Sequence, residues 1–342
     1  MSIYEEDIRL AAEQLNAEKF ADKTVLVTGA TGMIGGCVVD FFMELAAMRN
    51  INIHVIAVGR NAQRAKASFA RYLEQPNFSF LQHDVCDSFE DVELSGLDYI
   101  VHAASPATPN EFSKIPVEVM NSNFIGISRM LELAKKYQAR LLFVSSAEVY
   151  GNIDVEQKKE NDYGFLENID VRAAYPISKK AAETLCVAYG FEHGVETVIC
   201  RLSHVYGPTM TASDNRASSD FLRQGMAGRD IVLNNDNPVL RTYTYVVDAV
   251  SAMLYVLLQG EQSNVYNVAN PYSIVLIKEF ADIVAKLTGT KVIVKKPTAK
   301  EALGYTKINR QVVDCSKLMA LGWKPYFDIN AGIEHTIKAK QI

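Results

Sequence analysis

Short runs of apolar, mostly β-branched residues alternate with helical stretches through the first two thirds of the chain. The runs cover residues 24–29, 51–59, 78–84, 97–104, 139–146 and 195–203. Strands that are apolar on both faces and are separated by helices are typical of a parallel sheet covered on two sides. The expected helices fall at roughly 33–49, 61–74, 116–137 and 174–192. The pattern predicts an α/β fold with a doubly wound parallel sheet.

The rhythm changes after Tyr206, where a long polar loop at 207–220 begins. Further on we expect a helix near 219–227, a strand at 231–233, a helix near 246–259, a strand at 265–269 that returns to the sheet, a helix at 276–288, a strand at 291–295 and a short helix near 315–321. We therefore predict a nucleotide-binding domain from 1–206 plus about 240–272. A smaller, mainly C-terminal α/β substrate domain would comprise about 207–239 and 273–342.

Composition excludes several classes of protein. The 342 residues carry a formal net charge of −5, which gives no electrostatic reason to expect nucleic acid or an anionic membrane as a partner. No stretch approaches the roughly 18 uninterrupted apolar residues of a membrane span. The five cysteines are far apart and without a C-x-x-C pair, so free thiols and no metal site are expected. With no apolar signal segment at the N-terminus, a cytoplasmic location is expected.

A glycine-rich turn, G-A-T-G-M-I-G, follows the first strand and opens the first long helix of the sheet region. Such a turn lets backbone N–H groups approach a pyrophosphate at a helix N-terminus, where the helix dipole favours negative charge. The strand before it and the helix after it are the context that gives the motif meaning. It predicts a dinucleotide site lined by Gly29, Thr31, Gly32, Met33, Ile34 and Gly35.

The end of the second strand bears on the choice between NAD and NADP. An acidic residue there would bind the ribose 2′-hydroxyl of NAD, but the strand ends in Gly59 and Arg60. Arg60 could instead accommodate a 2′-phosphate, or stack over adenine without discriminating. We expect NAD, with NADP as the open alternative.

A tyrosine and a lysine four residues apart, Tyr175 and Lys179, begin the helix at 174–192. Positions four apart share a helix face, so the two side chains can converge on one site. A nearby cation is expected to lower the pKa of the phenol and make it a usable proton shuttle. Ser146 stands 29 residues before Tyr175, at the end of an apolar strand. Tyr175 and Lys179 are therefore candidate catalytic residues, and Glu148 follows the same strand end as Ser146.

These motifs together resemble the extended short-chain dehydrogenase/reductase family, the NAD-dependent epimerases and dehydratases. The likeness covers residues 23–330 and rests on the glycine loop, Y-x-x-x-K, SSAEVYG, RLSHVYGP, RTYTYVVDAV and LGWKP. It implies a Rossmann domain and a catalytic triad of Ser146, Tyr175 and Lys179, in which Tyr175 transfers a proton. Dimerisation through the helices at 116–137 and 174–192 is implied as well. It also implies cofactor contacts at Asp84, Val85, Ala103, Ala104, Ser105, Asn123, Tyr175, Lys179 and Ser203.

Within that family the chain looks most like the UDP-glucuronate decarboxylases, which act on a nucleotide-diphosphate sugar. The resemblance implies substrate contacts at Ser145, Ser146, His204, Arg216, Arg241 and Arg310. Those enzymes carry T-S-E where this chain has Ser146, Ala147 and Glu148. A carboxylate such as Glu148 can orient a C5 carboxylate or move protons there once C4 is a ketone.

Departures from the pattern keep alternatives open. His204 replaces the usual asparagine, and Cys315 and Ser316 stand where a basic residue is usual, which keeps a 4-epimerase close behind a decarboxylase. Ala147 replaces the acid of a 4,6-dehydratase and disfavours dehydration. Gly59 and Arg60 motivate another class, an NADPH-dependent carbonyl reductase.

Overall fold

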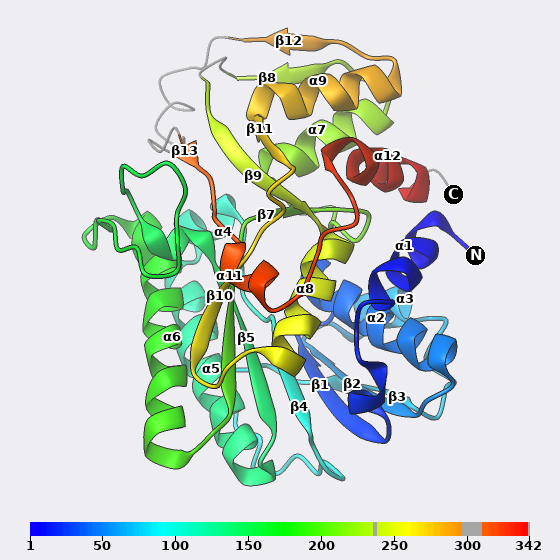
Figure 1. Cartoon of the computed structure of the whole chain (residues 1–342), viewed down its shortest axis with the longest axis vertical. Coiled ribbons are helices and arrows are strands. Elements are labelled where there is room, and N and C mark those ends of the chain that lie inside the picture. The colour runs from blue at the N-terminus through cyan, green and yellow to red at the C-terminus, as the bar shows by residue number, and fades with distance from the viewer. Residues whose placement is uncertain (235–237, 296–309, 341–342) are drawn as a thin grey trace.

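The computed structural model describes residues 1–234, 238–295 and 310–340, and its centre is a seven-stranded parallel sheet (Figure 1). The strands, in spatial order, are β3 (Phe78–Gln82), β2 (Ile53–Gly59), β1 (Lys23–Thr28), β4 (Tyr99–His102), β5 (Arg140–Ser146), β6 (Thr197–Leu202) and β10 (Asn264–Val268). All neighbours pair in parallel. The predicted doubly wound sheet is confirmed, including the return of the segment near 265–269 to the sheet.

Helices cover both faces of this sheet. The helices α2 (Met33–Arg49), α3 (Ala62–Ser68) and α8 (Val246–Gln259) lie on one face, and α5 (Pro116–Tyr137) and α6 (Ala174–His193) on the other. Each face has its own apolar core, with Val25 and Phe42 in one and Ile100 and Phe143 in the other. The predicted helices are confirmed, except that α3 ends at Ser68. Its expected last turn is wrong because the chain tightens there, where the Tyr72 N–H donates to the Phe69 carbonyl at 2.8 Å.

A smaller lobe stands over the carboxyl end of β6, because β7 (His204–Tyr206) follows β6 directly and pairs outside the main sheet. β7, β11 (Ile274–Leu276) and β13 (Arg310–Gln311) pair with β9 (Leu240–Tyr245), and β8 (Ile231–Leu233) pairs with β12 (Val292–Val294). The helices α7 (Ala217–Met226) and α9 (Ile277–Thr288) complete the lobe, whereas α11 (Ser316–Ala320) packs on β10 of the main sheet. The elements predicted near 219–227, 231–233, 276–288, 291–295 and 315–321 are confirmed within a few residues. The division into domains stays a prediction.

Two helices at the ends of the described chain were not predicted, α1 (Ile3–Ala12) and α12 (Ile329–Lys340). They contact each other, and α1 also packs on α2 and α8. Asp7 of α1 is buried, where it accepts a hydrogen bond from the Tyr245 hydroxyl at 2.8 Å and contacts His335 Nδ1 at 2.8 Å. The chain's two ends are therefore held together beside the phosphate-loop helix (Figure 1).

Short helices shape the surroundings of β5. η2 (Ala147–Tyr150) follows β5 at once, and the Ser146 hydroxyl caps it by accepting the Glu148 N–H at 3.2 Å. η3 (Val171–Ala173) leads directly into α6, and α4 (Pro109–Lys114) packs on η3 and α5. A fourth, η1 (Ala17–Phe20), precedes β1 at the opposite end of the sheet. Thus β5, η3 and α4 bring side chains to the start of α6, where Tyr175 lies.

Candidate active site

The glycine loop lies where the winding of the sheet reverses. β1 pairs with β2 on one side and with β4 on the other, so the loops after β1 and β4 meet at the switch point. Gly29 has a φ of +64°, and a Cβ there would lie 2.7 Å from Cα of Ala104 and 2.8 Å from the carbonyl oxygen of Ala103. Such contacts exclude any side chain, so glycine is what allows the two loops to touch.

The first turn of α2 suits an anion. Gly32 begins the helix with extended backbone, and among the described residues no side chain caps its first N–H groups. A Cβ on Gly35 would lie 2.3 Å from the Gly29 carbonyl oxygen, so the turn closes tightly over glycine. Uncapped N–H groups at Met33 and Ile34, with the helix dipole behind them, fit the pyrophosphate of a dinucleotide.

Arg60 and Asp84 approach each other beside the end of β2. Arg60 Nη1 lies 3.5 Å from Asp84 Oδ2, and the Arg60 side chain is 68% exposed. The side chain of Thr31 lies next to Gly59, where a Cβ would be 3.7 Å from its methyl carbon. The residues predicted at the adenosine end of the cofactor are therefore neighbours.

Other predicted cofactor residues differ in how far their polar groups are already engaged. Asn123 is buried; its Nδ2 donates to Ser178 Oγ at 3.0 Å, while its Oδ1 has no partner in the described part of the chain. The Ser203 hydroxyl shares a 2.7 Å hydrogen bond with Thr244, and the Ser105 hydroxyl donates to a neighbouring carbonyl at 3.4 Å. Val85 packs against α5, because a Cβ on Gly126 would lie 3.0 Å from it. Of these groups, Asn123 Oδ1 is the buried atom that lacks a hydrogen bond.

The predicted triad converges at the junction of β5 and α6. The Ser146 side chain is close enough to Tyr175 to lower the pKa of its phenol. The Lys179 ammonium lies 5.9 Å from the centre of the Tyr175 ring and donates to the Val144 carbonyl at 2.7 Å. Tyr175 and Lys179 are both buried. One turn of helix thus places the phenol and the amine on one face, beside the serine.

The electrostatics of this triad differ from the expectation. Burial raises the pKa of Tyr175, the carboxylate of Glu148 raises it further, and the Ser146 side chain and the charge of Arg216 lower it. Burial also lowers the pKa of Lys179 to about 7. The expectation that the pKa of Tyr175 is lowered is wrong, because desolvation by burial outweighs the positive charges near the phenol.

Cations gather around Glu148. Burial raises the pKa of its carboxyl group, and the charges of Arg172, Arg241 and Lys158 lower it. Arg241 is buried on β9, so its guanidinium reaches this site from the smaller lobe. A cluster of one carboxylate and several cations is suited to an anionic ligand.

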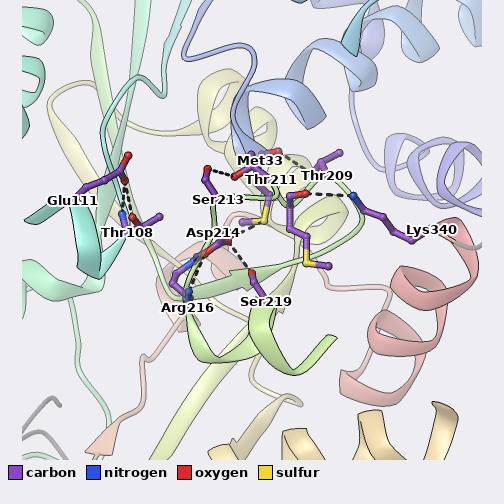
Figure 2. Close-up of polar contacts among 11 residues, drawn as sticks. Met33, Thr108, Glu111, Thr209, Thr211, Ser213, Asp214, Arg216, Ser219 and Lys340 are labelled. Carbon is purple, nitrogen blue, oxygen red and sulfur yellow. Dashed lines mark hydrogen bonds and ion pairs between the residues drawn. The ribbon is translucent and has the colours of Figure 1, made fainter. Parts of the chain in front are cut away.

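His204 and Arg216 complete the cluster from the smaller lobe. Burial and the charges of Arg241, Arg216 and Lys158 lower the pKa of His204 to about 3, so its ring is neutral. Arg216 forms a two-pronged ion pair with Asp214, with Nε at 3.0 Å from Oδ1 and Nη2 at 2.6 Å from Oδ2 (Figure 2). Its Nη2 also lies 3.6 Å from Met33 Sδ (Figure 2). This contact joins the loop before α7 to the first turn of α2.

Two predicted substrate residues lie apart from this cluster. The Ser145 hydroxyl points to the other side of β5 and donates to Glu183 at 2.5 Å, and Glu183 is in turn paired with Arg201. Arg310 donates to the Glu156 carbonyl at 2.7 Å on the exposed side of β13. The structure therefore brings Ser146, His204, Arg216 and Arg241 together, but engages Ser145 and Arg310 elsewhere.

The sequence did not predict three residues of the site. Lys158 lies in the irregular segment between η2 and η3, and Arg172 lies in η3; no sequence motif distinguishes either residue. Phe112 of α4 stacks on the Tyr175 ring. A positively charged residue three positions before the tyrosine was visible in the sequence, but its orientation was not.

Ala147 and Cys315, two departures from the family pattern, are packed in the same apolar surroundings. Both are buried in one apolar cluster with Tyr150 and Val313. Burial raises the pKa of the Cys315 thiol to about 12. Neither side chain can supply an acid or a charge, and in the described residues no group of three or more side chains is arranged to hold a metal ion.

Sequence comparison fits this geometry. A profile of the NAD dependent epimerase/dehydratase family matches residues 25–269. The chain belongs to this family. The resemblance stated from the motifs is therefore confirmed.

Members of the NAD dependent epimerase/dehydratase family with known names give closer comparisons. UDP-glucuronic acid decarboxylase 6 of Arabidopsis thaliana is 32% identical over 312 residues, which are 90% of this chain and 86% of that protein. UDP-glucuronic acid decarboxylase 1 of Xenopus tropicalis is 30% identical over 316 residues, 92% of this chain and 71% of that protein.

A solved structure shares the fold. UDP-glucuronic acid 4-epimerase from Bacillus cereus, in complex with UDP-glucuronic acid and NAD, superposes with a TM-score of 0.77 at 19% identity and covers 93% of this chain and 99% of that chain. At this identity the likeness shows the fold alone. Within the described residues, no helix is long and apolar enough to cross a membrane.

Proposed function

We propose that this chain is a nucleotide-diphosphate-sugar enzyme that acts through transient oxidation at sugar C4, and that its reaction is the decarboxylation of a UDP-glucuronate-like substrate. One observation carries the proposal: Ser146, Tyr175 and Glu148 act on one another at the end of β5, among the positive charges of Arg172, Arg241 and Lys158. The two relatives of about 30% identity named above are both UDP-glucuronic acid decarboxylases, which supports the same reaction.

The cofactor would lie along the glycine loop. Gly29, Gly32 and the first turn of α2 would hold its pyrophosphate, Arg60 and Asp84 its adenosine, and Tyr175 and Lys179 its nicotinamide ribose. When bound, the nicotinamide supplies the hydride chemistry that side chains lack, by accepting a hydride from C4 and returning it. The chain's own residues position the sugar and move its protons.

Ser146 and Tyr175 act on the C4 oxygen. The Ser146 hydroxyl donates a hydrogen bond to this oxygen, and Tyr175 takes the hydroxyl proton as the C4 hydride leaves. Since burial raises the pKa of Tyr175, the phenol releases its proton only against added positive charge. Lys179, with a pKa of about 7, provides such a charge when it is protonated.

Glu148 acts at C5. With C4 a ketone, a C5 carboxylate belongs to a β-keto acid, so its C–C bond breaks to release CO₂ and the electron pair is delocalised onto the C4 oxygen. A proton must then be delivered to C5. Because burial raises the pKa of Glu148, this carboxyl group can carry a proton nearer neutral pH than an exposed glutamate.

Arginines would hold the diphosphate. Arg241 and Arg216 approach the site from β9 and from the start of α7, and a guanidinium fork matches two phosphate oxygens. Arg216 is already braced by Asp214, which keeps its outer face oriented (Figure 2).

A 4-epimerase is the second candidate. His204 is neutral and stands where family members usually have asparagine, and Cys315 is buried and uncharged where decarboxylases tend to carry a cation. Dehydration is disfavoured because Ala147 faces an apolar cluster. A net NADPH-dependent carbonyl reductase is less well supported, because Glu148 and its cations have no part in that reaction.

The cofactor proposed is NAD, with NADP the alternative. The absence of a carboxylate at Gly59 and the exposed Arg60 favour NADP, whereas the pairing of Arg60 with Asp84 engages part of that guanidinium. Mass analysis of the cofactor released by denaturing the purified protein distinguishes the two.

A homodimer in the cytoplasm is the proposed form. Large apolar side chains are exposed on α5 and α6, namely Val117, Met120, Phe124, Val187 and Phe191. They support pairing through these two helices, and light scattering of the purified protein tests it. The five free cysteines suit a reducing compartment.

The test of the reaction is direct. The purified protein would be incubated with UDP-glucuronate, UDP-glucose and dTDP-glucose, and products followed by NMR. Release of CO₂ with a UDP-pentose from UDP-glucuronate is expected. Formation of UDP-galacturonate without CO₂ would replace the decarboxylase with the epimerase, and net NADPH consumption would favour the reductase.

A further inference from the structure

Lys158 is a buried lysine that the reaction proposed above does not use. It is 1% exposed and stands in the segment that leads from η2 to η3. Its backbone joins the two lobes, because its N–H donates to the Val312 carbonyl at 2.9 Å and its carbonyl accepts from the Asp314 N–H at 2.9 Å. The side chain is therefore fixed in place at the border between the sheet and the smaller lobe.

The ammonium of Lys158 makes fewer hydrogen bonds within the described residues than it has N–H donors. It donates to the Gly151 carbonyl at 3.2 Å, and within the described residues it forms no ion pair with a carboxylate. An ammonium has three N–H donors, and a buried charge without a counter-ion is costly. Such a group indicates that a ligand brings the missing anion.

The charged groups around Lys158 indicate which part of a ligand its ammonium would bind. Glu148 raises the pKa of Lys158, while burial and Arg241 lower it, to about 8 overall. Lys158 in turn acts on Glu148 and on His204. The hydrogen bond to the Gly151 carbonyl places the ammonium at the end of η2, the short helix that carries the carboxylate assigned to sugar C5. Glu148 in turn acts on Tyr175.

Building on the proposed function, we propose that Lys158 is a specificity residue that binds a carboxylate carried on C5 of the sugar, beside Glu148. Glu148 alone would repel a second carboxylate, and the two could share the site only with a cation between them. Arg241 and Arg216 have the planar forks that suit phosphate oxygens, which leaves the compact ammonium for the sugar carboxylate.

The experiment compares two ligands that differ only at C5. Calorimetry would measure the Kd of UDP-glucuronate and of UDP-glucose for the wild-type holoenzyme, for Lys158→Gln and for Lys159→Gln, since Lys159 is the exposed neighbour. Lys158→Gln is expected to weaken UDP-glucuronate by about tenfold or more, because a hydrogen bond to a charged group is lost, and to leave UDP-glucose within about twofold. Lys159→Gln should change neither.

Two outcomes overturn the inference. An equal loss for both ligands would assign Lys158 to the diphosphate, and unchanged affinity for both would remove it from the site. If Lys158→Gln fails to fold, the pH dependence of binding to the wild-type protein tests the inference instead. Lys158 loses its proton near pH 8. The affinity for UDP-glucuronate should therefore fall as the pH rises through about 8, whereas the affinity for UDP-glucose should not. Affinity for both ligands that is flat across this range would contradict the assignment.

The inference and the proposed function can fail separately. Selective binding of UDP-glucuronate that depends on Lys158, without release of CO₂, would uphold the carboxylate site and reject the decarboxylase. Release of CO₂ that persists with unchanged KM in Lys158→Gln would uphold the decarboxylase and reject the assigned role of Lys158.

Discussion

Phe112 stacks on the ring of Tyr175, with ring centroids 4.3 Å apart and planes at 14°. The contact joins α4 to the start of α6 and limits the rotation of the phenol toward or away from Ser146. A stacked pair contributes about 0.5–1.5 kcal/mol beyond burial. Phe112→Leu is therefore expected to lower kcat by about two- to tenfold with little change in KM.

Steady-state kinetics with UDP-glucuronate, alongside a melting curve, would check this expectation for Phe112. Phe20→Leu is the matched control, because Phe20 is equally buried but packs on Phe42 and Tyr99 near the opposite end of the sheet. If both variants lose stability and neither loses kcat, Phe112 has no part in positioning the phenol.

Glu148→Gln should lower kcat by about 10²–10⁴, the usual contribution of a proton-transfer group, with the fold and cofactor content unchanged. Glu148 must be protonated to deliver a proton to C5, and burial raises its pKa, so we expect wild-type activity to decline with rising pH only above the ordinary titration range of a glutamate. A pH profile of kcat and CO₂ release would measure both, with Glu74→Gln as the exposed control. A loss of only a few-fold would assign the proton transfer to another group.

Lys179→Met should abolish activity yet stabilise the fold. The pKa of Lys179 is about 7 in the folded chain and 10.5 ordinarily, so between these values the unfolded chain binds more protons and wild-type stability rises with pH. The cost of the buried lysine is thus complete below about pH 7 and fades toward 10.5. The gain in Tm for the variant should be larger near pH 6 than near pH 10.

Thermal melts of Lys179→Met at those two pH values would test this, with Lys180→Met as the control because the Lys180 ammonium lies over the largely exposed ring of Tyr163. An equal gain at both pH values would mean that packing, and not the buried charge, causes the change.

Gly29→Ala should prevent cofactor binding. Gly29 and Gly194 have similar left-handed backbones, with φ of +64° and +68°, but a Cβ on Gly194 would meet no atom of the described chain within 4 Å. Gly194→Ala should therefore cost only about 1–2 kcal/mol of backbone strain. Gly29→Ala adds a clash with Ala103 and Ala104, and should lose more stability as well as the dinucleotide.

Denaturant unfolding and the absorbance of bound nicotinamide would compare Gly29→Ala with Gly194→Ala. Retention of the cofactor by Gly29→Ala would show that the loop can open without losing its function, contrary to the close packing seen between the β1 and β4 loops.

Local patterns predicted most of the sheet and the centre of the site. The glycine loop can be recognised from the strand before it and the helix after it. Tyr175 and Lys179 can be recognised from their spacing of one helical turn, so both features can be inferred from adjacent residues. Lys158 could not be found this way: it alternates with exposed Lys159, and only pairing with Val313, far along the chain, decides which of the two is buried. The pKa of Tyr175 was mispredicted for a related reason, since burial is a property of the assembled fold.

Some misses were avoidable. Ile329, Ile333 and Ile337 repeat every four residues after Asp328, whose carboxylate accepts the Ala331 N–H at 2.9 Å, so a capped amphipathic helix was visible in the sequence of α12. The capping box of Ser2 and Glu5 gave the same signal for α1.

The contacts of Asp7 with Tyr245 and His335 also bear on the order in which the chain folds during its synthesis. During synthesis α1 leaves the ribosome before the groups that bind Asp7, which lie on β9 and α12. In the meantime α1 can pack on α2, but its Asp7 carboxylate lacks both partners. A nascent chain stalled before residue 335 would therefore lack one of the two partners that bind the Asp7 carboxylate of α1.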